Sequence, residues 1–268
     1  MRVILFNDKQ NFDGSLSLLN KRYGRDKKRF WNYEKYIPFL IEKIKSIDPL
    51  KNEELQLIKS YFYTGKYSSN IISSFKWSCN QKISELNKLI RNEEGLLEFI
   101  SKQNIDQEIK NKIKDHVKFV KNSYEIKRKD YIRRIEKQKR NFEGQKEFFE
   151  KIRGNPFIEM RTTPLKQADG EMYQKGVDVK LATDLVNLAH TKAYDIALIL
   201  GGDTDLIESI KLVKESLGQI VIVVAFYTPG NPELSTISDL MRVTKFINLN
   251  DLSDEEIAKM SDLLVNNS

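Results

Sequence analysis

Strand and helix patterns alternate along the last third of the chain, and this alternation constrains the fold more than any other feature. The continuous apolar run Ile196–Leu200 predicts a buried strand, helical spacing follows at Leu206–Leu217, and Ile220–Phe226 predicts a second buried strand. A short strand at Phe246–Leu249 and a helix at Asp254–Leu264 continue the series. Such alternation is typical of a doubly wound sheet of parallel strands. We therefore expect an α/β fold with a mostly parallel sheet flanked by helices.

The first half of the chain begins with a short apolar segment. Val3–Phe6 is too short for the core of a signal peptide and fits a first strand. We expect a polar loop at Asn7–Asn11, and a helix at Phe39–Ile47, where apolar residues recur at helical spacing. The pattern of Leu55–Tyr63 is ambiguous between a helix end and a strand. After a Gly-Asn-Pro breaker, Phe157–Thr162 is expected to form a further strand.

A segment of different composition lies between these strands. From Trp77 to Ile152 there is no proline, and apolar residues recur three and four positions apart, which predicts two to four amphipathic helices arranged as hairpins. Residues 76–153 carry 21 Lys and Arg against 13 Asp and Glu, a net charge of +8 in a chain of net charge +7. We therefore expect a basic helical insertion at 76–153 within a discontinuous domain formed by 1–75 and 154–268. Such a charge favours a polyanionic partner, most often nucleic acid.

Composition excludes several kinds of site. Cys79 is the only cysteine, so an intramolecular disulfide and a cysteine-rich zinc site are excluded. The two histidines, His116 and His190, lie in no recognisable catalytic signature. No apolar run is long enough to span a membrane, and we expect a cytoplasmic protein without a membrane partner. Carboxylates are left as the candidates for chemistry.

Aspartates follow the ends of separate strands. Asp8 follows the first strand, whereas Asp203 and Asp205 follow Ile196–Leu200, after two glycines that allow a sharp turn. Ligands bind beyond the carboxyl ends of parallel strands, so we expect these side chains to lie close together. Taken alone, the run Gly201–Asp205 favours a helix N-cap over a metal site. The aspartate at a second strand end shifts that balance, because converging carboxylates stay ionised together only when a cation neutralises them.

A third acidic group accompanies the predicted helix Asp178–Thr191. Asp178 opens that helix, and Asp184 lies nearly two turns further along it, facing either substrate or solvent. Oxygen ligands of this kind suit magnesium or manganese, which keep bound waters and bind substrate phosphates. Such an ion lowers the pKa of a bound water and neutralises a leaving oxygen. The aspartates therefore predict metal-dependent chemistry on a phosphate ester.

Three runs of residues resemble the NYN domain, a family of PIN-like ribonucleases that includes the LabA-like proteins. The runs are Phe6–Asn11, Lys175–Asp184 and Leu198–Leu206, in the order and with the spacing of the family. The second and third runs together are specific, whereas the first alone is weak. The resemblance extends over about residues 1–20, 57–68 and 156–250.

The resemblance implies a PIN-like fold and a metal-dependent nuclease that acts most often on RNA. It implies that one acidic cluster binds the metal and serves catalysis, formed by Asp8, Asp178, Asp203 and Asp205. It further implies that Asn11 supports the first loop and that Lys175 meets a phosphate of the substrate.

The chain departs from the family pattern in two places. The first motif usually reads Asp-Gly-x-Asn, and here Lys9 and Gln10 stand between the aspartate and the asparagine. The family often has an aspartate just before the phenylalanine of its last strand, and here Thr244 lies near that position, with no aspartate in Val243–Phe246. These departures motivate an alternative, a catalytically weak or inactive NYN-type protein that binds RNA or acts as a scaffold.

Two basic runs interleave aromatic side chains. Lys121–Arg140 carries nine Lys and Arg against three acidic residues, which favours contact with RNA phosphates and bases. The substrate contacts expected there are Arg128, Arg133 and Arg134. A solvated helix whose aromatic residues pack inward is the competing interpretation. Lys21–Trp31 could flank the metal cleft, and Tyr227–Pro232 could form its rim or an ordinary turn.

The leading hypothesis is an endoribonuclease that hydrolyses RNA with magnesium or manganese and holds its substrate through the basic insertion. The insertion could also mediate a homo-oligomer or bind a protein partner. A phosphohydrolase for small phosphoesters is less favoured, because enzymes of the haloacid dehalogenase type place their Asp-x-Asp on the first strand.

Overall fold

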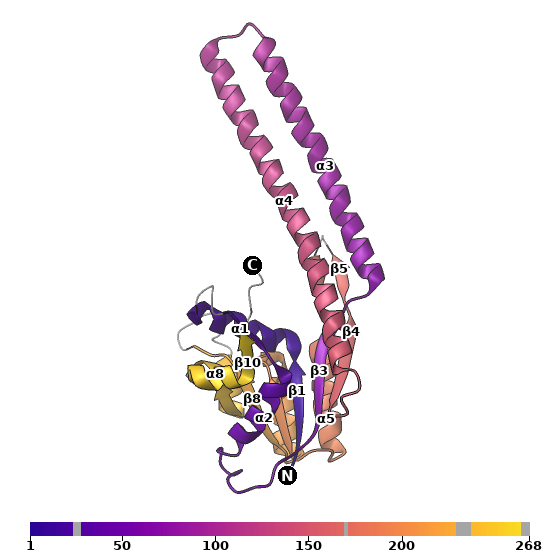
Figure 1. The fold of residues 1–268 in the computed structure, drawn as a ribbon, viewed down its shortest axis with the longest axis vertical. Helices are drawn as coiled ribbons and strands as arrows, with labels where there is room; N and C mark the ends of the chain where they lie inside the picture. The colour runs from indigo at the N-terminus through magenta and orange to yellow at the C-terminus, as the bar shows by residue number, and fades with distance from the viewer. Residues whose placement is uncertain (24–27, 169–170, 229–236, 264–268) are drawn as a thin grey trace. The chain divides into compact units, whose positions relative to one another are not determined.

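The structure, a computed structural model, describes residues 1–23, 28–168, 171–228 and 237–263. The chain divides into two compact units (Figure 1). The sheet unit consists of Met1–Gly65, Gly154–Thr163 and Lys175–Ser268, and the hairpin unit consists of Lys66–Arg153 and Pro164–Gln174. Within the described ranges, no helix is both long enough and apolar enough to cross a lipid bilayer.

A central sheet organises the sheet unit. Six strands from the described ranges form it in the spatial order β4-β3-β1-β7-β8-β9. Their bounds are β1 Arg2–Asp8, β3 Gln56–Lys66, β4 Ile158–Pro164, β7 Ile196–Leu200, β8 Ile220–Ala225 and β9 Lys245–Asn248. β1 pairs in parallel with both β3 and β7, and parallel pairing continues from β7 through β8 to β9. The predicted α/β fold with a mostly parallel sheet is confirmed.

Helices pack on both faces of this sheet. They are α1 Lys9–Tyr23, α2 Tyr33–Ile44, α5 Val177–His190, α6 Ile207–Lys211, α7 Ile237–Val243 and α8 Asp254–Met260. Successive side chains of a strand point to opposite faces. Phe6 of β1 accordingly shares a hydrophobic core with Leu185 of α5, whereas Asn7 donates through Nδ2 to the hydroxyl of Tyr36 in α2, 2.7 Å away.

Two predictions near the chain start need correction or completion. The polar loop predicted at Asn7–Asn11 is instead the end of β1 and the start of α1. Phe12, Leu16 and Leu19 are buried, so they give α1 an apolar face that stabilises the helix despite its polar start. The ambiguous segment Leu55–Tyr63 belongs to strand β3.

Two predicted C-terminal helices are shorter than expected. The helix expected over Leu206–Leu217 is instead a series of a 3₁₀ turn at Thr204–Leu206, α6, and a π turn at Leu212–Ser216. The closing helix α8 ends at Met260, and β10 (Ser261–Leu263) then pairs antiparallel with β2 (Arg29–Trp31). The helix ends because the next residues pair with β2, a segment far away in the sequence. The local spacing of apolar residues cannot predict such a pairing.

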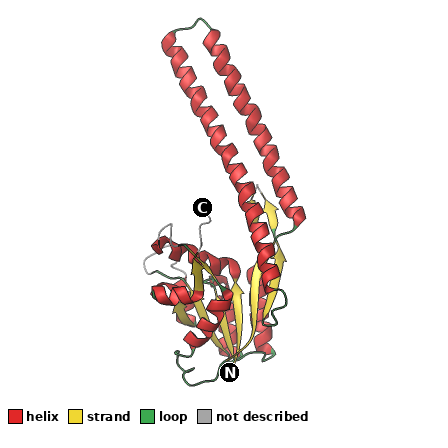
Figure 2. Cartoon of the chain, in the orientation of Figure 1, coloured by secondary structure: helices red, strands yellow, loops and turns green. Residues whose placement is uncertain are grey.

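Two long antiparallel helices make up most of the hairpin unit (Figure 2). They are α3 Ser69–Lys102 and α4 Gln107–Ile152, so the predicted range of two to four helices resolves to two. Lys121 Nζ lies 2.6 Å from Glu94 Oε1, and Arg128 Nη1 donates to Asn87 Oδ1 at 3.2 Å, which fixes the antiparallel register. A short antiparallel strand pair, β5 (Lys166–Ala168) and β6 (Glu171–Tyr173), completes the unit.

Candidate functional site

Three aspartates converge at the carboxyl ends of the parallel strands. Asp8 is the last residue of β1, Asp178 lies in the first turn of α5, and Asp203 follows β7. Carboxylate oxygens of the three residues all lie within 4.8 Å of one another. Asp8 and Asp203 are 195 residues apart in the chain (203 − 8), and parallel pairing brings them together because it aligns the strand ends.

Asp8 is the buried member of this cluster, with 3% of its surface exposed. Its pKa is raised to about 6, chiefly because burial disfavours the charged form. The backbone N–H of Asn11 donates to Oδ1 at 3.1 Å and opposes this shift, whereas the charges of Asp178 and Asp203 add to it. The carboxylate is therefore ionised at neutral pH in surroundings that favour a neutralising cation.

A glycine turn sets β7 against the end of β1. Gly201 has a φ of +138°, and a Cβ there would lie 3.2 Å from the Cβ of Asp8. The N–H of Gly202 donates to Oδ1 of Asn11 at 2.9 Å. Asn11 therefore links the segment after Asp8 to the turn before Asp203.

Asp203 takes part in both a helix cap and the acidic cluster. Its Oδ1 accepts the N–H of Asp205 at 2.9 Å and caps the 3₁₀ turn. The Asp205 side chain is exposed and lies outside the group of three. It still acts on Asp178, whose pKa is raised first by burial and then by the charges of Asp203 and Asp205.

Asp184 was expected to face either substrate or solvent, and Lys175 was expected to meet a substrate phosphate. Asp184 accepts a hydrogen bond from the Tyr63 hydroxyl at 3.0 Å, and Arg161 Nε lies 3.7 Å from its Oδ2. The Arg161 guanidinium also lies 4.8 Å from the centre of the Tyr61 ring. Lys175 is exposed just before α5. Sequence reasoning missed Arg161, whose one signal is a basic residue inside a predicted strand.

The two departures from the family pattern make local contacts. Lys9 is the first residue of α1 and pairs with Asp13 one turn further along. The hydroxyl of Thr244 donates to the carbonyl oxygen of Leu240 at 2.7 Å, at the end of α7. Both residues thus stabilise helix ends in their own neighbourhoods.

The predicted run Lys21–Trp31 and the predicted rim Tyr227–Pro232 extend outside the described residues, at 24–27 and 229–232. The described end of the first run belongs to the fold: Trp31 donates through Nε1 to the carbonyl oxygen of Phe12 at 3.0 Å.

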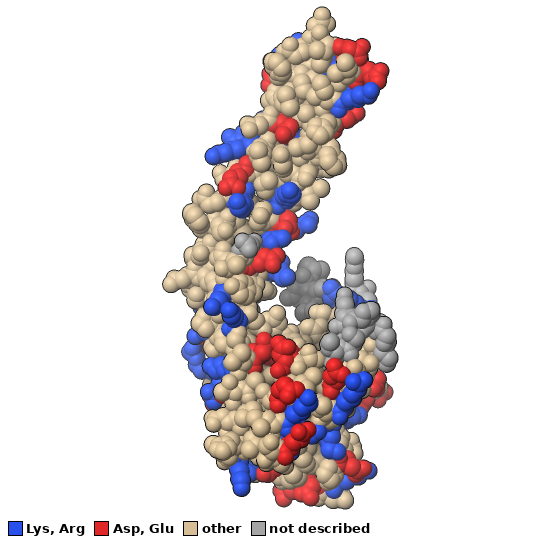
Figure 3. Space-filling model, turned by 180° about the vertical axis from the view of Figure 1, so that it is seen from behind, with Lys and Arg blue, Asp and Glu red and all other residues tan. Residues whose placement is uncertain are grey.

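All three predicted arginines lie on α4 of the hairpin unit. Arg128 is half-buried against α3, and Arg134 pairs with two acidic side chains at 2.8 and 3.2 Å. Arg133 is exposed and, with Lys137, lines a polar cleft of 430 Å³. Lys and Arg side chains appear along the hairpin in Figure 3, interspersed with Asp and Glu. Arg133 and Lys137 are thus the exposed cations among the described residues that line this cleft.

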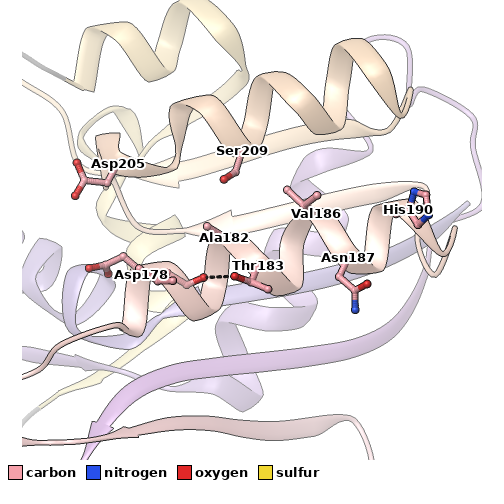
Figure 4. Close-up of a pocket in the computed structure, with 9 residues that line it drawn as sticks. Asp178, Ala182, Thr183, Val186, Asn187, His190, Asp205 and Ser209 are labelled. Atoms are coloured by element: carbon pink, nitrogen blue, oxygen red, sulfur yellow. Dashed lines mark hydrogen bonds between the residues drawn. The ribbon is translucent and has the colours of Figure 1, made fainter.

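A groove of 660 Å³ adjoins the acidic cluster on the sheet unit. Its lining comes from α5, α6 and the turn before α6, with Asp178 and Asp205 at one end and His190 at the other (Figure 4). Sequence reasoning did not find this groove, because it depends on α5 and α6 packing side by side.

The donor set of the cluster fits a hard divalent cation. Asp8, Asp178 and Asp203 offer only oxygen ligands, which suit magnesium or manganese better than zinc. Two of the three carboxyls have raised pKa values, so a cation would relieve both burial and mutual repulsion.

The family model of the NYN domain matches residues 99–250, which is more than half of the chain. No curated protein matches the chain. Among solved structures, a protein of unknown function from Vibrio parahaemolyticus is similar, with 12% sequence identity and a TM-score of 0.47 over 97% of this chain and 96% of that one.

Proposed function

The chain belongs to the NYN domain family, and on that basis we propose that it is a divalent-metal-dependent endoribonuclease that hydrolyses phosphodiester bonds in RNA. The observation that carries the proposal is the convergence of Asp8, Asp178 and Asp203 within 4.8 Å. The resemblance to PIN-like nucleases implies an acidic metal-binding cluster, and the cluster here lies where β1 and β7 end.

The three aspartates would hold magnesium or manganese. When bound, the ion supplies a water of lowered pKa and neutralises charge on the leaving oxygen. Asn11 keeps the β1 end and the Gly201 turn together, which fixes the spacing of the carboxylates. We assign to exposed Lys175, three residues before Asp178, a contact with a substrate phosphate.

The test is cleavage of a mixed RNA panel with magnesium or manganese, using wild type and Asp203→Asn. Asparagine keeps an oxygen for the cap but removes the charge, so a folded variant is expected to lose cleavage by at least about 100-fold. Asp239→Asn is the matched control, because Asp239 is exposed and pairs with Arg242 at the surface. Equal cleavage by wild type and Asp203→Asn under every condition would refute the catalytic role.

A second candidate is an NYN-type module that binds RNA without cutting it. The density of cations on the hairpin unit favours it, because phosphate contacts alone give salt-sensitive affinity. RNA binding of equal strength with and without metal, together with no heat of magnesium or manganese binding in calorimetry, would support this candidate over the nuclease.

A further inference from the structure

The groove beside the acidic cluster has two chemically different parts. Asp178, a member of the cluster, and Asp205 lie at one end of the groove, so the groove is continuous with the proposed metal centre (Figure 4). Along the rest, apolar Ala182 and Val186 alternate with polar Thr183 and with further polar groups toward the far end. A ligand that enters from the cluster therefore meets hydrogen-bonding groups set against an apolar surface.

The charge of the lining restricts what such a ligand presents. None of the nine described residues that line the groove is Lys or Arg, and two of them are aspartates. A phosphate would therefore meet no Lys or Arg among the lining residues, and a cation bound at the cluster would provide the one strong positive charge beside the groove. The uncharged part of a nucleotide, its ribose and base, suits the remainder, because bases combine apolar faces with polar edges.

The length of the groove matches this division. Asn187 lies nine residues after Asp178 on α5, which corresponds to about 13 Å along the helix axis. A nucleotide whose phosphate lies at the cluster extends its base by a comparable distance. Asn187 is exposed, and its side-chain amide offers both a donor and an acceptor, the combination that pairs with base edges. Across the groove, Ser209 of α6 adds a hydroxyl (Figure 4).

We propose that this groove binds the base and ribose of the nucleotide next to the scissile phosphate, with Asn187 as a specificity-determining residue. The inference rests on the proposed function for the identity of the ligand as RNA. A base read by Asn187 must have its edge free, so the substrate class is single-stranded RNA or an unpaired loop. Thr183 already donates its hydroxyl to the carbonyl of Val179 at 2.7 Å, so it can act toward a ligand only as an acceptor.

The experiment measures binding of the four nucleoside 5′-monophosphates to the full chain by calorimetry, with and without magnesium. We expect metal-dependent binding, tighter than that of inorganic phosphate, with a preference among the bases. Asn187→Ala is expected to weaken binding of the preferred nucleotide by about tenfold and to reduce the differences in affinity among the four bases. Glu208→Ala is the control, because Glu208 is an exposed neighbour on α6 outside the groove lining and pairs with Lys211 at the surface.

Three results would overturn the inference. One is binding of all four nucleotides no tighter than inorganic phosphate. Another is a base preference that Asn187→Ala leaves unchanged. The third is a pair of observations on Val179→Asp, which places a charge in the groove: the variant abolishes self-association of the chain, and it leaves nucleotide binding unchanged. That result would mean that a second copy of the chain, rather than a nucleotide, occupies the groove. Base-selective nucleotide binding without RNA cleavage would refute the proposed catalysis and support this inference. RNA cleavage that Asn187→Ala leaves unchanged would support the catalysis and refute the role of Asn187.

Discussion

Asp8 illustrates a conflict between stability and metal binding at a single residue. The carboxyl is buried at the end of β1, and its pKa is raised to about 6 by burial foremost. At neutral pH the metal-free protein must therefore keep a buried negative charge close to two other aspartates. This cost of ionisation is relieved by a bound cation, which favours a binding role for this position.

The pH dependence of stability should report this charge. The folded-state pKa of Asp8, about 6, lies above the unfolded value of 3.8, so the folded protein holds the proton more tightly. The cost of ionising Asp8 is absent below about pH 4 and fully present above about pH 6, where it amounts to about 3 kcal/mol. We expect metal-free wild type to lose stability between these values, and Asp8→Asn to lose less, as measured by thermal unfolding in chelator.

Magnesium provides the control for this prediction. Added ion should raise the melting temperature of wild type at pH 7 and leave Asp8→Asn nearly unchanged, because the variant lacks one ligand charge. A wild-type protein whose stability is flat from pH 4 to 7 in chelator would contradict the assignment.

Gly201 is a second residue with a sharp expected effect. Alanine there must adopt a φ of +138° and place its Cβ 3.2 Å from that of Asp8. We expect Gly201→Ala to lower the free energy of unfolding by about 1–3 kcal/mol and to weaken magnesium binding, since either the turn or Asp8 must move. Denaturant unfolding and calorimetry measure the two effects.

Gly14 offers a matched control in α1. A Cβ at Gly14 meets nothing within 4 Å, so Gly14→Ala should stabilise the helix by about 0.5–1 kcal/mol and leave metal binding intact. If both variants behave alike, close approach at Gly201 does not position Asp8.

At the scale of elements, the sequence predicts best what hydrophobic patterning alone decides. Strand β7 has the predicted bounds Ile196–Leu200, because a run of five buried apolar residues has no polar interruption to shift its ends. The start of α1 was mispredicted, since its polar first turn hides the buried spacing of Phe12, Leu16 and Leu19. The short pairing of β2 with β10 depends on segments about 230 residues apart, so no local pattern encodes it.

The candidate site likewise has features that the sequence pattern predicts and features that it does not. The grouping of Asp8, Asp178 and Asp203 follows from strand ends that meet at one edge, and the sequence supports it. The exposure of Asp205 and the pairing of Asp184 with Tyr63 depend on side-chain direction, which spacing does not give. The groove along α5 and α6 required the packed helices.

The exposed cations of the hairpin cleft are expected to contribute to RNA binding. Arg133 and Lys137 are exposed and line one cleft, so the double variant Arg133→Glu with Lys137→Glu should weaken RNA binding at low salt by more than tenfold. The slope of log affinity against log salt should also fall by about one for each lost phosphate contact. Fluorescence anisotropy with labelled RNA measures both.

The charge change is matched by a different double variant, Lys112→Glu with Lys114→Glu, on the same helix nearer the turn between α3 and α4. Equal loss of affinity in both double variants would mean that net charge, rather than the cleft around Arg133, governs binding.

At the scale of the whole molecule, charge and chemistry belong to different parts of the chain. Residues 76–153 carry the net charge of +8, whereas Asp8, Asp178 and Asp203 all belong to the sheet unit. Affinity for RNA and metal chemistry should consequently be separable by changes confined to one unit. The hairpin tip is the place to test this, because Gly95–Val120 holds five Lys against four acidic residues and contributes little net charge.

Replacement of Gly95–Val120 by a short Gly-Ser turn should preserve both activities. Glu94 and Lys121 form an ion pair at 2.6 Å across α3 and α4, so a turn can close the shortened hairpin between them without moving the remainder. The basic run Lys121–Arg140 is retained, and we expect RNA affinity within about threefold of wild type and unchanged magnesium binding. A loss of affinity as large as that of the Arg133 and Lys137 variant would assign RNA binding to the tip. A loss of magnesium binding would instead mean that the two units do not function independently.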